Sequence, residues 1–151
     1  MKNIFIRCIL ISFSCSTFAS DQDITGVWRN IDDKTGFRKG LIEISKDANN
    51  VYTGKVLQID PRPGYTPKTI CTGCPSPYTD QPILGMHVIT NMKADPNKPS
   101  EFSGGTILDP VNAKIYKGRL SINSKGDRLT VRGFIGLSVI GRSQTWIRKK
   151  D

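Results

Sequence analysis

The chain has 151 residues, the length of one ordinary domain. Hydrophobic residues make up 37% of it, and with 14 glycines the apolar share is that of a soluble globular protein, which excludes general disorder. The 22 Lys and Arg residues against 13 Asp and Glu residues give a net charge of +9. Such a charge favours anionic partners but does not by itself indicate nucleic-acid binding.

The first 19 residues have the features of a secretory signal peptide. Lys2 and Arg7 precede a mostly apolar run over 8–18, and small residues lead up to Ala19, after which we expect cleavage. This run is too short to span a bilayer, which takes about 20 residues.

An alternative interpretation is lipid modification of Cys15, which the bulky Phe13 two residues earlier disfavours. We therefore expect the mature protein to be a single domain over 20–151 that is periplasmic or secreted. It is not expected to be an integral membrane protein.

Strand signals dominate this mature chain. Short runs rich in Val, Ile, Thr and aromatic residues alternate with turn-forming clusters, and Gly or Pro interrupts nearly every window in which a helix could form. The expected strands are 24–28, 40–45, 51–59, 83–90, 102–108, 114–122, 128–135 and 138–148. Hairpin connections are expected at 32–36, 47–50, 109–112 and 123–127.

Side-chain alternation favours a closed barrel. In the run 114–122, Tyr116, Leu120 and Ile122 share one face while Lys117 and Arg119 share the other. Consecutive antiparallel strands without helical crossovers can bury their apolar face by closing on themselves. The sequence therefore predicts an all-β fold, an antiparallel up-and-down barrel of about eight strands.

A proline-rich loop over 60–82 contains both cysteines of the expected mature chain, Cys71 and Cys74. Their spacing alone is compatible with a redox pair, half of a metal site or a local disulfide. A redox pair should open a helix, and tetrahedral zinc needs further ligands where the sequence offers only His87. We favour the disulfide, and expect no bound metal.

No arrangement of residues predicts an enzyme or a cofactor. His87 lies alone in an apolar strand pattern, and the few scattered carboxylates form no catalytic pair by spacing. Nucleic acid is not an expected partner, because the densest basic run, 148–150, lies in the C-terminal tail. Attraction to an anionic envelope surface is a simpler use of the positive charge.

Trp28 near the expected mature start and Trp146 and Arg148 near the end suggest how a barrel would close. First and last strands meet in such a barrel, and the guanidinium of Arg148 could lie over an indole ring at one end. An ordinary core tryptophan and a solvated arginine fit the same spacing.

The ordered motifs of the chain resemble those of the exported bacterial family known as domain of unknown function 2147. They are GVW at 26–28, DKTG at 33–36, CTGC at 71–74, GGTILDP at 104–110, RGFIG at 132–136 and GRSQTW at 141–146. The resemblance implies a lipocalin-like barrel and brings no settled activity. Phe102 and Ala113 depart from the tryptophan and the turn glycine that the resemblance leads us to expect.

Two functions follow from a barrel of this size. In the first, the protein is a non-enzymatic carrier that holds a small apolar or amphipathic, fatty-acid-like ligand. Its expected ligand-binding residues are Ile42, Ile44, Val56, Tyr116, Leu120, Ile122, Val131 and Ile135, with Arg142 at the mouth. In the second, the barrel is filled with side chains and serves as a structural or interaction module of the cell envelope.

Overall fold

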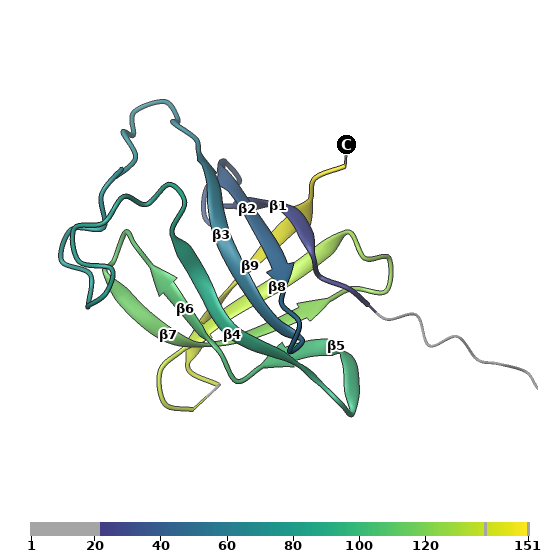
Figure 1. The fold of residues 1–151 in the computed structure, drawn as a ribbon. Coiled ribbons are helices and arrows are strands. Elements are labelled where there is room, and N and C mark those ends of the chain that lie inside the picture. Colours follow the sequence, from purple (N-terminus) through teal and green to yellow (C-terminus); the bar gives the residue numbers. More distant parts are fainter. Residues whose placement is uncertain (1–21, 138, 151) are drawn as a thin grey trace, which may run out of the picture.

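The computed structural model describes residues 22–137 and 139–150, so the predicted signal peptide at 1–19 lies outside the described residues. The strands found in the described part are β1 (Gly26–Ile31), β2 (Arg38–Lys46), β3 (Val51–Ile59), β4 (His87–Asp95), β5 (Lys98–Ser103), β6 (Thr106–Asp109), β7 (Lys114–Ile122), β8 (Arg128–Phe134) and β9 (Gly141–Arg148). They wrap around one interior (Figure 1). Within these ranges, no helix is long and apolar enough to cross a membrane.

The strands form a closed antiparallel barrel. β1 pairs with β2 on one side and with β9 on the other, so that Trp28 lies between Ile42 and Arg148. β5 and β6 occupy one position in the wall, because both pair with β4 and with β7. Nine strands thus fill eight positions. The predicted all-β barrel of about eight strands is confirmed.

The prediction of one strand over 102–108 was wrong, and two glycines explain why. Gly104 has a φ of +82°, and a Cβ atom on Gly105 would lie 2.2 Å from the carbonyl oxygen of Thr90. Glycine permits both the left-handed backbone and the close approach. The chain bends there and divides into β5 and β6. The preceding strand β4 also extends further than predicted, to a hairpin between Asp95 and Lys98.

One end of the barrel is closed and filled with side chains. The segment that precedes β1 crosses this end and places Ile24 in the core with no exposed surface. The indole Nε1 of Trp28, also fully buried, donates a hydrogen bond to the carbonyl oxygen of Ile24 at 2.9 Å. Nearby, Tyr52 and Phe102 pack edge to face with ring centroids 5.0 Å apart. We call this the closed end.

Arg148 joins the first and last strands at the closed end. Its guanidinium carbon lies 4.3 Å from the centroid of the Trp28 ring. Its nitrogens donate to the backbone carbonyl oxygens of Asp23 at 2.8 Å, Thr25 at 2.6 Å and Gly126 at 2.6 Å. Trp146, next to it on the inner face of β9, is buried. Trp28, Trp146 and Arg148 thus lie together where the first and last strands pair.

The long connection from β3 to β4 is held in place by several contacts. Cys71 and Cys74 form a disulfide with Cα atoms 5.5 Å apart, as predicted, and both are buried. A backbone bridge joins Ile70 to Pro82 at the base of this excursion. Lys68 Nζ donates to the carbonyl oxygen of Val111 at 3.0 Å and so ties the connection to the β6–β7 turn. The connection covers part of the barrel end opposite the closed end.

Candidate functional site

The barrel is hollow at the end opposite the closed end. A cavity of about 730 Å³ opens there, between the β1–β2, β3–β4, β6–β7 and β8–β9 connections, and we call this opening the mouth. In Figure 1 these connections lie toward the left of the molecule, and the closed end lies toward the right. The cavity reaches inward until the buried side chains of the closed end fill the interior.

The cavity wall is built from strand positions that alternation assigns to the inner face. Of the predicted ligand-binding residues, those that line the cavity are Ile42, Val56, Tyr116, Val131, Ile135 and Arg142. The structure thus brings six predicted residues together around one space. Whether they bind a ligand remains a prediction.

Three predicted residues do not reach the cavity. Ile44, Leu120 and Ile122 lie deeper, where they are at most 5% exposed and belong to the packed core. Alternation identifies the face of a strand but not the depth at which the interior becomes hollow. Ile135 is a different case, because β8 ends at Phe134 and alternation ends with it. Ile135 lies in the following loop, lines the rim of the cavity and is 63% exposed rather than inward and buried.

Polar groups in the cavity wall were missed by the sequence reasoning. Asn30 and Gln144 both line the cavity, and Gln144 Oε1 accepts a hydrogen bond from Trp146 Nε1 at 3.4 Å. Asn30 Oδ1 is buried and has no hydrogen-bond partner in the described structure. A signal did exist, since Asn30 alternates with Trp28 on β1 and Gln144 with Trp146 on β9. A buried amide oxygen without a partner can accept a hydrogen bond from a polar group inside the cavity.

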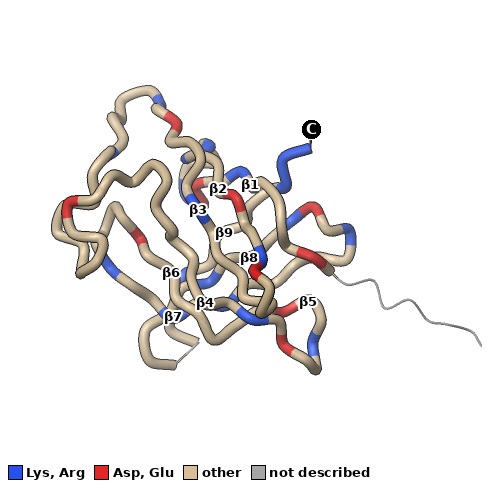
Figure 2. Tube along the Cα trace, in the orientation of Figure 1, with Lys and Arg blue, Asp and Glu red and all other residues tan. Residues whose placement is uncertain are grey.

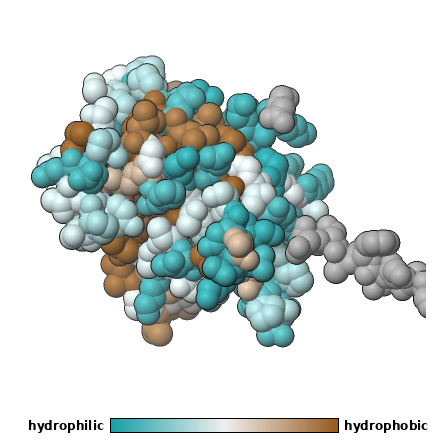
Figure 3. Space-filling view, viewed as in Figure 1, coloured by the Kyte–Doolittle hydropathy of each residue, from teal (hydrophilic) through white to brown (hydrophobic). Residues whose placement is uncertain are grey.

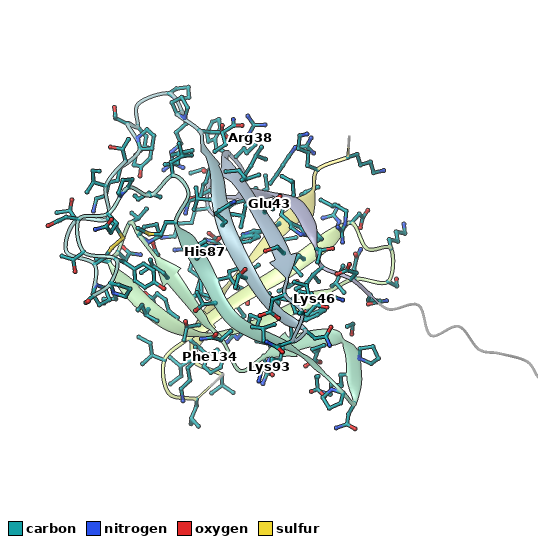
Figure 4. The ribbon with its side chains drawn as sticks, viewed as in Figure 1. Arg38, Glu43, Lys46, His87, Lys93 and Phe134 are labelled. Carbon is teal, nitrogen blue, oxygen red and sulfur yellow. A yellow bond between two sulfur atoms is a disulfide. The ribbon has the colours of Figure 1, made fainter. Side chains whose placement is uncertain are left out.

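Charged residues surround the mouth. The cations among the cavity-lining residues are Lys34, Arg38, Lys39, Arg62, Lys68 and Arg142, and the anions are Asp32, Asp60 and Asp109. Arg38 forms an ion pair with Asp60, and Arg62 with Asp32 at 3.7 Å. The lining residues extend across the molecule: in Figure 4, Arg38 lies toward the top of the view and Phe134 toward the bottom. Cations outnumber anions around the opening, which favours a negatively charged group there.

Arg142 is bound to the β1–β2 connection. It forms a two-pronged ion pair with Asp33, with Nε 3.0 Å from Oδ2. The hydrogen bond from Arg142 lowers the pKa of Asp33, and the same bond raises the pKa of Arg142. Burial raises the pKa of the neighbouring Asp32, but hydrogen bonds from Thr35 and Lys34 outweigh it and lower the pKa overall. These carboxylates are ionised at neutral pH and order the rim of the mouth.

Replacing Asp33 with Asn should reduce stability at pH 7 but not in strong acid. A carboxyl whose pKa is lowered by folding stabilises the protein above its ordinary pKa of 3.8, and this contribution disappears as the pH falls through the folded value. Because the pair is partly exposed, we expect a loss of about 0.2–1 kcal/mol at pH 7. Thermal unfolding followed by circular dichroism from pH 7 down to about pH 2 measures it. A difference between variant and wild type that stays constant across this range would contradict the assignment.

His87 has no catalytic surroundings. It lies exposed on β4, outside the cavity lining, and makes no hydrogen bond or ion pair with the described residues (Figure 4). Cys71 and Cys74 are bonded to each other. Within 22–137 and 139–150, no three His, Cys, Asp or Glu side chains are placed to hold a metal ion. The hypothesis of an enzyme that uses His87 or the cysteines therefore gains no support from this geometry.

Comparison with solved structures gives a lipocalin-like neighbour. Protein HP1028 from the human pathogen Helicobacter pylori, described as belonging to the lipocalin family, aligns with a TM-score of 0.69. The alignment covers 85% of this chain and 84% of that chain at 17% sequence identity. At this identity the likeness concerns the fold, which is a lipocalin-like barrel. A search of curated proteins gave no significant match.

A family model covers almost all of the described barrel. The model described as "Uncharacterized protein conserved in bacteria (DUF2147)" matches residues 26–148, from the first residue of β1 to the last residue of β9. Since the match includes every strand of the barrel and well over half of the chain, the protein belongs to the DUF2147 family.

Proposed function

We propose that the protein is a non-enzymatic carrier of the bacterial envelope that holds one small apolar or amphipathic, fatty-acid-like ligand inside its barrel. The apolar part of the ligand lies among Ile42, Val56 and Val131. Its polar or anionic end lies at the mouth, near Arg142 and Arg38. The lipocalin-like barrel supports the binding of some small molecule. The fatty-acid-like class of ligand is our own proposal.

The observation that carries this proposal is the cavity of about 730 Å³. Small-molecule sites typically occupy about 300–1,000 Å³, with mostly apolar walls and a few polar groups that orient the ligand. This cavity has that composition, with aliphatic and aromatic walls, the amides of Asn30 and Gln144, and a basic rim. A structural module with a filled barrel is less well supported, because only the closed end is filled.

We also propose that the protein works in the periplasm or outside the cell. The N-terminal residues have the composition of a cleavable export signal. The disulfide between Cys71 and Cys74 fits an oxidising compartment, since disulfides are rare in the bacterial cytosol. In the envelope, lipids and their breakdown products are available as ligands.

Native mass spectrometry of the purified protein tests the carrier function. Protein taken from the exported fraction is measured before and after delipidation, and then after incubation with a long-chain fatty acid such as palmitate. We expect one added ligand mass per chain and no more than one, because a single cavity of this size holds one ligand. Absence of any retained mass, together with no uptake of fatty acid after delipidation, would contradict the proposal.

A further inference from the structure

The exposed hydrophobic side chains are concentrated at the mouth end. Among the described residues, the large ones are Phe37, Leu57, Tyr65, Ile70, Leu84, Val111, Ile115, Ile135, Leu137, Val139 and Ile140. Nine of them lie in the four connections around the mouth, and Leu57 and Ile115 lie at the mouth-side ends of β3 and β7. None lies in the β2–β3, β4–β5 or β7–β8 turns, where the described residues form the closed end.

The β8–β9 connection contributes the most exposed of these side chains. Ile135, Leu137, Val139 and Ile140 are 63%, 73%, 79% and 71% exposed, and we call these four residues the apolar lip. In Figure 1 their connection projects below the barrel at the lower left, and Figure 3 shows hydrophobic surface in that place. Single exposed aliphatic residues are ordinary on soluble proteins, whereas a contiguous group at a loop tip marks an interaction surface.

The base of the apolar lip is fixed to the barrel. Arg132 on β8 donates from Nη1 to Ser143 Oγ at 2.9 Å and from Nη2 to the carbonyl oxygen of Val139 at 3.2 Å. The side chains of Leu137 and Val139 nevertheless project into solvent and do not line the cavity. The tip of the lip is therefore presented outward, while Ile135 and Ile140 at its base line the rim of the cavity.

The barrel wall beside the lip is strongly basic. The sequence from 110 to 150 contains ten Lys and Arg residues and a single acid, Asp127, which lies in the turn at the closed end. On the outer face, Arg119 is paired across the strands with Arg132, and Lys117 lies two residues before Arg119 on β7. Figure 2 shows that Lys and Arg positions recur along β7. Like charges directly opposite each other destabilise a sheet. Among the described residues Arg119 forms no ion pair, so its charge is open to an external anion.

From these observations we propose that the protein docks with its mouth on an anionic lipid surface. The apolar lip inserts between the lipid headgroups, and Lys117 and Arg119 contact lipid phosphates. The transfer of a ligand between this surface and the cavity rests on the proposed carrier function, but docking itself does not. Contact with a second copy of the chain through the same face is disfavoured, because it would bring two basic surfaces together.

Vesicle co-sedimentation tests the docking. The protein is purified from the exported fraction, with its N-terminus determined by mass spectrometry, and mixed with vesicles of phosphatidylcholine alone or with about 30% phosphatidylglycerol. We expect binding to the anionic vesicles that is at least about tenfold tighter than to the neutral ones and that weakens as salt is added. Equal affinity for both, or no binding to either, would overturn the proposal.

Two pairs of variants locate the docking surface. Leu137→Ser with Val139→Ser should weaken binding to anionic vesicles about tenfold, because it removes two inserted aliphatic groups. Leu57→Ser should not, because β3 lies on the opposite side of the barrel wall from β8 and the lip. Lys117→Gln with Arg119→Gln should weaken it by a similar factor, whereas Lys125→Gln with Arg128→Gln removes the same charge at the closed end and should have little effect. Equal losses in the control variants would contradict the assigned face.

The remaining outcomes separate docking from ligand binding and from self-association. Concentration-dependent dimerisation that the Leu137 and Val139 substitutions abolish, without vesicle binding, would show that a second copy covers the lip and would overturn the proposal. If the wild type takes up fatty acid from solution yet binds no vesicles, the carrier function stands and docking fails. If it binds vesicles and takes up no ligand, docking stands and the carrier function fails.

Discussion

Replacing Arg148 with Met should lower the free energy of unfolding by about 2–4 kcal/mol, because three backbone carbonyl groups lose a charged hydrogen-bond donor at once. Those groups belong to Asp23 and Thr25, in the segment that precedes β1, and to Gly126, in the β7–β8 turn. The substitution also removes a cation–π contact of about 0.5–2 kcal/mol with Trp28. Part of the loss is recovered because water can reach carbonyl groups near the surface.

Urea unfolding followed by circular dichroism measures this loss, and the matched control is Arg128→Met. Arg128 is an exposed arginine on the neighbouring strand β8, and its side chain makes no hydrogen bond with the described residues. Its replacement removes the same charge and should change stability by less than about 0.5 kcal/mol. Arg148→Lys should fall between the two, since it keeps the positive charge but not the planar group that reaches several acceptors. If Arg148→Met and Arg128→Met are equally stable, Arg148 does not secure the closure.

The pairing of the first and last strands could be predicted from the sequence because it depends on position along the chain. In an up-and-down barrel the first and last strands must pair, and Trp28 and Arg148 lie in those strands. The alternation of inner and outer residues also held within single strands such as β7 and β8. These features are local or follow directly from topology.

The features that could not be predicted from the sequence depend on contacts between distant segments. The division between β5 and β6 is due to the close approach of Gly105 to Thr90, and no local pattern identifies which carbonyl group a glycine will face. The depth of the cavity floor was equally hidden, because Ile44 and Leu120 alternate like the residues that line the cavity. Ala113 illustrates a third case. Its φ of +54° explains why a glycine is expected in that turn, yet the residue present gives no sign of that backbone conformation.

Replacing Val56 with Trp should abolish ligand uptake while leaving the barrel folded. Val56 lies on the inner face of β3, 6% exposed, and lines the cavity beside Ile42, its partner on β2. An indole at this position occupies space that the ligand requires, and we expect affinity to fall at least about tenfold, which corresponds to about 1.4 kcal/mol. Overpacking a filled core costs about 1–3 kcal/mol, but here the added ring projects into a hollow, so the cost should lie at or below the lower limit.

The matched control is Leu57→Trp, one residue further along the same strand and on the opposite face. Leu57 is 38% exposed and does not line the cavity, so the same indole on the outer wall should leave uptake unchanged. Titration of delipidated protein with a fluorescent fatty acid gives both affinities, and circular dichroism confirms that both variants are folded. Vesicle binding should survive Val56→Trp, because the apolar lip and the basic face are untouched. If the ligand bound both variants as tightly as the wild type, it would lie outside the cavity, and the carrier function would have to be assigned to another surface.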